Sequence, residues 1–205
     1  MSDAATGSLR LGVFGGAFDP PHVGHRALVE AALVQLQLDA LCIVPTGHAW
    51  HKERELSLAR HRIAMAELAF ADLPQVRVDP RETLRSGPSY TVDTLRELHA
   101  ERPGATLFLL MGQDQASVLH GWHAWREVVL LAIICVAARE DPAGATGRFI
   151  APAGLEPRFL QLRCPVLPVS ATDIRARAGA HQSIAPLVGA AVARYIVHHH
   201  LYQSA

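Results

Sequence analysis

The chain has 205 residues, 50% of them hydrophobic, and a formal net charge of zero. This length suits one domain with a sizeable core, and the balanced charge gives no indication of a nucleic-acid or membrane-surface partner. No apolar run reaches the ~18 residues that a membrane span needs. Residues 1–8 lack the basic and apolar parts of a signal peptide, so we expect a disordered tail before a single domain at 9–203.

Apolar, β-rich runs alternate with helical patterns along the whole chain. The pattern predicts strands at 9–14, 40–45, 75–79, 106–112, 132–139 and 160–169. It predicts helices at 25–38, 58–71, 91–103, 113–119 and 125–131, and two closing helices at 171–178 and 187–200. The strands are nearly continuous apolar runs, which is typical of strands buried on both faces. The sequence therefore predicts an α/β fold, a single Rossmann-like doubly wound parallel sheet with C-terminal helices.

Cysteine and histidine usage indicates a cytoplasmic protein without a metal site of its own. Cys42, Cys135 and Cys164 are widely spaced and form no CxxC pair, so we expect reduced core residues. The 12 histidines match no HExxH or zinc-ligand spacing. We interpret the run at 198–200 as a polar helix end, with adventitious metal binding as the alternative. The Gly/Pro-rich segment at 139–158 is the best candidate for a mobile loop.

The stretch "GGAFDPPHVGH" lies between the first strand and the first helix. Gly15 and Gly16 have no side chains, so the backbone there can approach a ligand closely. A helix that starts near His22 offers free N–H groups and the positive end of its dipole to a phosphate. His22 and His25 are three residues apart and share one face of the first turn. The stretch predicts a phosphate-binding turn with histidine donors; the alternative is two unrelated surface histidines at a helix cap.

This stretch also carries a family resemblance. It resembles the GxFDPxHxGH signature of the nucleotidyltransferase superfamily that includes nicotinate-mononucleotide, pantetheine-phosphate and CTP-dependent transferases, and "SATDIR" resembles the superfamily's second signature. Further segments are similar to the bacterial nicotinate-nucleotide adenylyltransferases: "PSYTVDTL", "GQDQ" followed by "GWHAWRE", and "YIVHHHLY". The resemblance extends from about residue 9 to residue 202.

The resemblance implies an enzyme of NAD biosynthesis. ATP and nicotinate mononucleotide would give nicotinate adenine dinucleotide and pyrophosphate, with Mg²⁺ carried by the ATP phosphates. The alternatives are an adenylyltransferase for nicotinamide mononucleotide, another HxGH-type adenylyltransferase, or a non-catalytic nucleotide sensor on the same fold. The oligomeric state is open, a homo-oligomer included.

The resemblance also implies roles for individual residues. The catalytic residues would be His22, His25, Lys52 and Arg175. ATP would be bound by Gly15, Gly16, Ala17, Phe18, His22, His25, Gly112, Asp114, Ser170, Thr172 and Arg175. The mononucleotide would be bound by Phe18, Asp19, Lys52, Tyr90, Thr91 and Trp122.

Several of these residues have a second interpretation. Lys52 can be a solvated loop lysine, and "AWH" precedes it where the family often has prolines. Asp114 can be an aspartate at a helix start that the dipole favours. Ser170 is a good N-cap, and Asp173 completes a box-like capping pattern with it. Arg175 has no such local explanation, and a planar guanidinium suits bidentate phosphate binding.

The second half of the predicted site would hold the pyridine ring. A flat ring favours an aromatic face, so we expect Trp122 to stack on it and Trp125 to serve packing. The backbone at Tyr90 and Thr91 would present N–H groups to the substrate. The alternative for this stretch is a helix start capped by Ser89 or Thr91.

Overall fold

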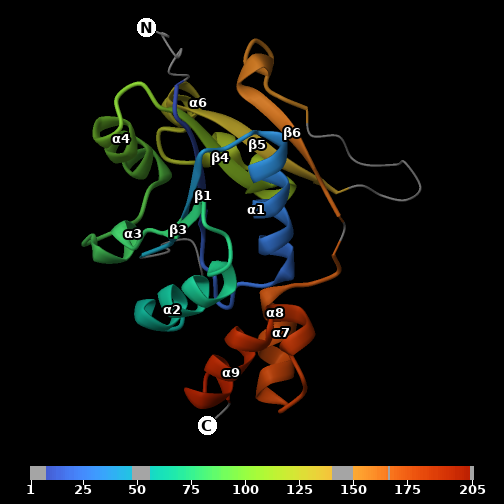
Figure 1. The fold of residues 1–205 in the computed structure, drawn as a ribbon. Helices are drawn as coiled ribbons and strands as arrows, with labels where there is room; N and C mark the ends of the chain where they lie inside the picture. Colours follow the sequence, from blue (N-terminus) through green and yellow to red (C-terminus); the bar gives the residue numbers. More distant parts are fainter. Residues whose placement is uncertain (1–7, 48–55, 140–149, 166, 204–205) are drawn as a thin grey trace, which may run out of the picture.

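The computed structural model describes residues 8–47, 56–139, 150–165 and 167–203 (Figure 1). Lys52, residues 1–7 of the expected tail and residues 140–149 of the expected mobile loop lie outside these residues. The strands are β1 (Arg10–Gly16), β2 (Ala40–Pro45), β3 (Val76–Val78), β4 (Thr106–Gly112), β5 (Ala132–Arg139) and β6 (Phe159–Cys164). The helices are α1 (Val23–Gln35), α2 (Ala59–Phe70), α3 (Arg81–Leu84), α4 (Thr91–Glu101), α5 (Gln113–Ser117), α6 (Trp125–Leu131), α7 (Ala171–Gly179), α8 (Ala185–Val188) and α9 (Ala190–His198), with 3₁₀ turns η1 (Leu119–Gly121) and η2 (Glu156–Arg158).

The sheet confirms the predicted architecture. Within the described residues the strands form one six-stranded sheet in the order β3-β2-β1-β4-β5-β6, and every neighbouring pair is parallel. This is the doubly wound order in which the chain reverses its direction of travel between β1 and β4. In such sheets a ligand binds in the crevice beyond the carboxyl ends of the strands at the reversal point.

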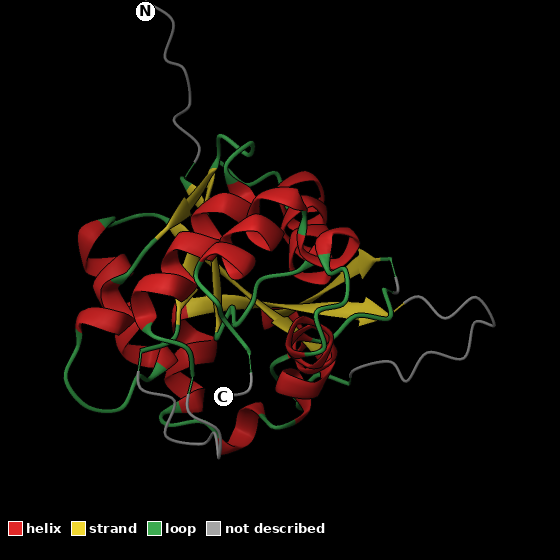
Figure 2. Cartoon of the chain, turned by 90° about the horizontal axis from the view of Figure 1, so that it is seen from below, coloured by secondary structure: helices red, strands yellow, loops and turns green. Residues whose placement is uncertain are grey.

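Alternating strand residues supply a separate core on each face of the sheet. In β4, Leu107, Leu109 and Met111 pack with α4, α5 and α6, whereas Phe108 and Leu110 pack with α1 and α2. This alternation follows from the two-residue period of a strand. Helices accordingly lie on both sides of the sheet (Figure 2), and the central strands are buried on both faces as predicted.

The C-terminal helices form a small layer of their own below the sheet in Figure 1. Their buried side chains, including Ile174, Val188, Val192 and Ile196, pack with Met65 of α2. This layer therefore places α7 and the end of the chain beside the turn that leaves β1.

Three details differ from the sequence prediction. The last strand ends at Cys164 and not at residue 169, because Pro165 and Pro168 have no N–H for the strand ladder. The helix expected at 187–200 is divided at Gly189, whose φ of 83° is incompatible with a helix. The short helix α3 follows β3 where only a loop was expected. The run His198–His200 forms the end of α9 and the residues after it, as predicted.

Candidate active site

A cavity of about 1140 Å³ opens at the carboxyl ends of β1 and β4, where the sheet reverses. It brings together most of the residues predicted from the sequence: Gly15, Gly16, Ala17, His22, His25, Tyr90, Thr91, Gly112, Trp122 and Ser170. It is also lined by residues that were not predicted, among them Phe14, Thr46, Glu82, Gln115 and His123. Five other predicted residues are described by the structure but are not part of the lining: Phe18, Asp19, Asp114, Thr172 and Arg175.

The two histidines of the turn are adjacent in space. His22 is the N-cap of α1, and its N–H donates to Nδ1 of His25 at 3.2 Å. The two imidazole rings stack with their centroids 3.7 Å apart. The ring of His25 also lies 5.1 Å from that of Phe18. The expected shared face is confirmed, and Phe18 supports this face from the core side, where it is 1% exposed.

His22 is held in a neutral state by its surroundings. Burial lowers the pKa of His22 to about 4, and Nδ1 has no hydrogen-bond partner among the described residues. Gly24 makes this packing possible: a Cβ there would lie 3.1 Å from Cε1 and Nδ1 of the His22 ring and 3.1 Å from Cγ1 of Val169. A neutral imidazole has one N–H donor and one acceptor, so His22 can donate to a phosphate oxygen that enters the cavity.

Two glycines at the strand ends leave room for a ligand. A Cβ built on Gly15 at the end of β1, or on Gly112 at the end of β4, would meet no atom within 4 Å. Both residues line the cavity and are exposed. A side chain at either position would therefore occupy cavity space and would not clash with the protein.

The second signature begins α7 beside the same turn. The Ser170 Oγ accepts the Asp173 N–H at 3.1 Å and donates to the Asp173 carboxylate at 2.7 Å, which confirms the predicted cap. Arg175 donates through Nη1 to the carbonyl of Asp19 at 2.8 Å and through Nη2 to Oγ1 of Thr172 at 3.1 Å. The first and second signatures thus touch directly, although they are far apart in the sequence.

Asp19 is buried below the turn and does not face the cavity. It is 2% exposed, and its carboxylate accepts from the Tyr202 hydroxyl at 2.7 Å and from the Ser57 N–H at 3.1 Å. Sequence reasoning missed Tyr202 and the equally buried Arg62, which is 2% exposed. A usable signal was the position of Arg62 on the same face of α2 as the apolar Met65 and Ala66, since a charge on a buried helix face needs a partner.

The other end of the cavity carries aromatic side chains. Tyr90 is the N-cap of α4, and its ring lies over that of His123 with centroids 4.3 Å apart. Trp122 is half-buried and packs on the core cluster behind it, as does Trp125, which does not line the cavity. The alternative of a cap at Ser89 or Thr91 is wrong, because Tyr90 takes the N-cap position of α4.

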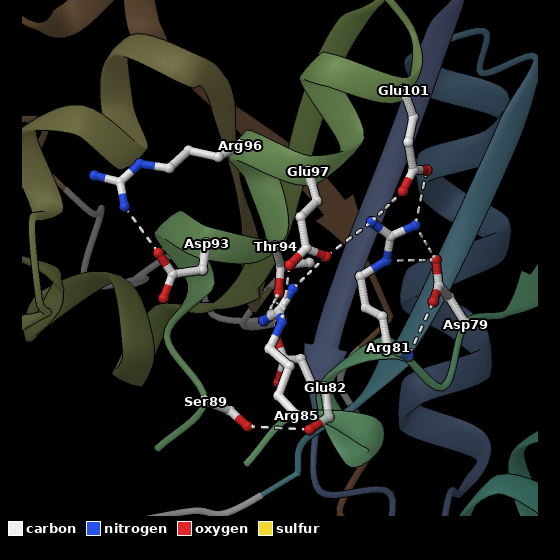
Figure 3. Close-up of polar contacts among 10 residues, drawn as sticks. All are labelled: Asp79, Arg81, Glu82, Arg85, Ser89, Asp93, Thr94, Arg96, Glu97 and Glu101. Carbon is white, nitrogen blue, oxygen red and sulfur yellow. Dashed lines mark hydrogen bonds and ion pairs between the residues drawn. The ribbon is translucent and has the colours of Figure 1, made fainter. Parts of the chain in front are cut away.

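A network of charged residues supports this aromatic end (Figure 3). Arg85 Nη1 donates to Oγ1 of Thr94 at 3.0 Å, and Thr94 donates to the Glu82 carboxylate at 2.7 Å. Burial raises the pKa of Glu82. Arg85 also pairs with Glu97 at 2.6 Å. Figure 3 shows these side chains bridging α3 and α4, which fixes the segment between them that carries Ser89 and Tyr90 to the cavity.

Gly47 marks the close approach of a neighbouring segment. A Cβ on Gly47 would lie 1.9 Å from the Glu82 carbonyl oxygen and 2.7 Å from Oγ of Ser89. The end of β2 therefore packs backbone to backbone against the start of α3, and this contact defines one wall of the cavity beside Thr46.

No group of three or more His, Cys, Asp or Glu side chains in the described part of the chain could hold a metal ion. The three cysteines form no disulfide and are buried, as predicted, and burial raises the pKa of Cys135 to about 12. None of the described helices is both long enough and apolar enough to span a bilayer.

Comparison with known proteins agrees with this site. The family model described as cytidylyltransferase-like matches residues 13–177. A protein of Albidiferax ferrireducens named "Probable nicotinate-nucleotide adenylyltransferase" is 62% identical over 196 residues, covering 96% of this chain and 99% of the relative. A protein of the same name from Methylibium petroleiphilum is 42% identical over 197 residues, covering 94% and 92%.

Solved structures share the fold at low sequence identity. Nicotinic acid mononucleotide adenylyltransferase of Plasmodium falciparum, complexed with NaAD, superposes with a TM-score of 0.74 at 16% identity, covering 94% of this chain and 97% of that one. The same enzyme complexed with APC gives a TM-score of 0.74 at 17% identity, covering 94% and 96%. Together with the cavity that joins both signatures, the match to close relatives over nearly the whole chain shows that this chain belongs to the cytidylyltransferase-like family and, within it, to the nicotinate-nucleotide adenylyltransferases.

Proposed function

We propose that this chain joins ATP and nicotinate mononucleotide to give nicotinate adenine dinucleotide and pyrophosphate. The observation that carries the proposal is the 62% identity over 96% of the chain with a relative that bears this enzyme's name. The cavity supports it, because one open space reaches from the turn after β1 to the aromatic end at Trp122. Two ligands can therefore lie end to end within it.

In this proposal ATP occupies the part of the cavity next to the turn. At Gly15, Gly16 and Ala17 the triphosphate can approach the backbone closely. The N–H groups at the N-terminus of α1 can donate hydrogen bonds to its phosphate oxygens. Gly112 leaves open space at the end of β4, where the adenosine would lie. Ser170, at the start of α7, lines the same part of the cavity.

The nicotinate mononucleotide occupies the aromatic end. The ring of Trp122 offers a face on which the pyridine can stack. The first N–H groups of α4, around Tyr90 and Thr91, have no partner within the helix and can receive the nicotinate carboxylate. Glu82 lies on the same wall. Burial raises the pKa of Glu82, so its neutral form is favoured more than that of an exposed glutamate.

The transfer itself needs positioning and charge stabilisation more than acid–base catalysis. The 5′-phosphate of the mononucleotide is already anionic near neutral pH and attacks the α-phosphorus of ATP, with pyrophosphate leaving. Preorganised donors aimed at the developing charge lower the barrier, and an in-line arrangement of the two substrates supplies the rest. We assign the donor role to His22 and His25, which stack at the turn.

Arg175, Thr172 and Lys52 complete the proposal. Arg175 and Thr172 are adjacent at the start of α7, and a guanidinium there can turn towards the β- and γ-phosphates. Lys52 would contact a substrate phosphate; it lies outside the described residues. Asp114, in the first turn of α5, and Phe18, in the core behind His25, remain proposed contacts of the substrates.

Mg²⁺ fits this site as an ion carried by ATP. Magnesium in nucleotide enzymes is commonly bound by substrate phosphates and waters with one or two carboxylates, and does not need a protein cage. Asp173 is the carboxylate on the ATP side of the cavity lining. The ion would neutralise part of the negative charge on the phosphates. We also propose a cytoplasmic location, which the lack of a disulfide among the three buried cysteines supports.

Steady-state kinetics with two mononucleotides tests the substrate. Nicotinate presents a carboxylate, whereas nicotinamide presents an amide whose NH₂ would face N–H groups at the start of α4. An unmatched buried polar group costs about 1–3 kcal/mol. We therefore expect kcat/KM, followed by pyrophosphate release, to be at least about tenfold higher for nicotinate mononucleotide. Equal efficiencies would refute the assigned acid specificity and leave the adenylyl transfer intact.

A further inference from the structure

A polar cluster with Asp19 and Arg62 buried at its centre lies on the core side of the phosphate turn. We call it the Asp19 cluster: Asp19, Ser57, Arg62, Arg175 and Tyr202. Its members come from the turn, the residues before α2, α2 itself, α7 and the segment after α9. Segments up to 183 residues apart in the sequence therefore meet at one point below the turn.

The carboxylate of Asp19 is the centre of the cluster. Its two oxygens accept from the Tyr202 hydroxyl and the Ser57 N–H, at 2.7 and 3.1 Å. Burial and the charge of Asp19 raise the pKa of Tyr202, so the hydroxyl stays a neutral donor at physiological pH. A carboxylate that is 2% exposed is stable only with such donors, because burial removes its water.

The arginines of the cluster bind the carbonyl oxygens of the turn. Arg62 donates through Nη1 to the carbonyl of Ala17 at 3.0 Å and through Nε to that of Ser57 at 2.9 Å. Arg175 donates to the carbonyl of Asp19 at 2.8 Å. Two carbonyl oxygens of the turn, those of Ala17 and Asp19, therefore already accept N–H groups from guanidinium side chains.

The orientation of these carbonyls decides what the turn offers to a phosphate. In a trans peptide the N–H points opposite to the C=O. Because the Ala17 carbonyl faces the buried Arg62, the N–H of Phe18 faces away from the cluster. Phe18 itself has a φ of 48°, a left-handed conformation that a bulky residue adopts only when its surroundings impose it. Arg62 holds the peptide before Phe18, and Arg175 holds the Asp19 carbonyl one residue after it.

We propose that Tyr202 and Arg62 are positioning residues for ATP: Tyr202 acts through the Asp19 carboxylate and Arg62 through the Ala17 carbonyl, and together they hold the turn that receives the triphosphate. Neither side chain lines the cavity, so both act through the turn. The mononucleotide end, at Tyr90 and Trp122, belongs to other elements and does not depend on this cluster. The inference rests on the proposed function insofar as ATP is the ligand of the turn.

Tyr202→Phe tests the proposal with a small perturbation. It removes the donor to Asp19 and keeps the ring that packs in the C-terminal layer. Calorimetric titrations with Mg·ATP and, separately, with nicotinate mononucleotide measure both affinities. We expect the Kd for ATP to rise at least about fivefold, the lower end of typical couplings between sites, and the Kd for the mononucleotide to change less than about twofold. Arg62→Lys keeps the charge, but a lysine can reach only one of the two acceptors, the carbonyls of Ala17 and Ser57. We expect the same selective loss of ATP affinity.

Tyr195→Phe is the matched control. Tyr195 lies on α9 in the same layer, and its hydroxyl is 3.0 Å from Nδ1 of His61, away from the turn. Its removal should leave both affinities unchanged.

The outcomes separate this inference from the proposed function. If Tyr202→Phe leaves ATP affinity unchanged, or weakens both ligands equally, the positioning role is refuted. If the wild-type protein binds ATP but does not react with nicotinate mononucleotide, the proposed reaction is wrong while the titrations still decide the inference. If the wild-type protein does not bind ATP, both are refuted.

Discussion

Replacement of Gly15 by alanine separates ligand binding from folding. A Cβ added at Gly15 would meet no protein atom within 4 Å, and the φ of Gly15 is not in the left-handed region. Gly→Ala at a compatible position restricts the unfolded chain and stabilises by about 0.4–1 kcal/mol. For a chain of this length we expect Tm to stay the same or to rise by roughly 1–4 °C.

The same methyl group enters the space that the proposed site gives to ATP. A displacement of reacting groups by about 1 Å can cost ~10²-fold in rate. We therefore expect kcat/KM for ATP to fall by at least about tenfold in Gly15→Ala, while thermal unfolding shows an intact fold. Steady-state kinetics with varied ATP, together with a thermal melt of the same preparation, measures both effects.

Gly104→Ala is the control with the opposite pattern. Gly104 has a φ of 88° and does not line the cavity. An alanine there is strained, so stability should fall by more than about 1 kcal/mol while the KM for ATP stays constant. Wild-type kcat/KM in Gly15→Ala would contradict our assignment of the open space beside β1 to ATP.

Three further predictions concern the turn and its partner helix. His25→Ala should lower kcat by roughly 10²–10³-fold, which is the scale for the loss of one preorganised donor. The Tm should fall as well, because the His25 ring packs on His22 and Phe18. A variant with normal turnover would exclude His25 from the mechanism. Arg175→Lys keeps the charge but loses the planar fork, so the KM for ATP should rise severalfold; a rise only in the KM for the mononucleotide would show that the two subsites are reversed. Burial lowers the pKa of His22 from 6.5 to about 4, so the folded protein binds fewer protons than the unfolded chain between these values. Stability from this residue is complete above pH 6.5 and falls as the pH drops towards 4, and His22→Gln should flatten that part of a denaturation profile; an unchanged profile would refute the buried neutral state.

The sequence alone determined the strands of the central sheet and their parallel, doubly wound class. The strands at 40–45, 106–112 and 132–139 are found with the predicted bounds. Strands buried on both faces are continuous apolar runs, so their signal is local and does not need a partner to be recognised. The turn with His22 and His25 was predictable for a similar reason: two glycines, the helix start and the three-residue spacing are all local features, and the structure confirms the shared face.

Only the tertiary structure decided which polar residues support the site. The sequence prediction placed Asp19 against the mononucleotide, whereas the fold buries it against Tyr202, 183 positions away. The sequence did not identify Glu82 and Arg62 as buried residues, because whether a charged side chain is buried depends on the helices and strands that pack over it. Local sequence patterns determine the secondary structure and the ligand-binding turn. The burial of the Asp19 carboxylate and the direction of the Ala17 carbonyl depend instead on contacts between segments that are distant in the sequence, and no short stretch of sequence contains that information.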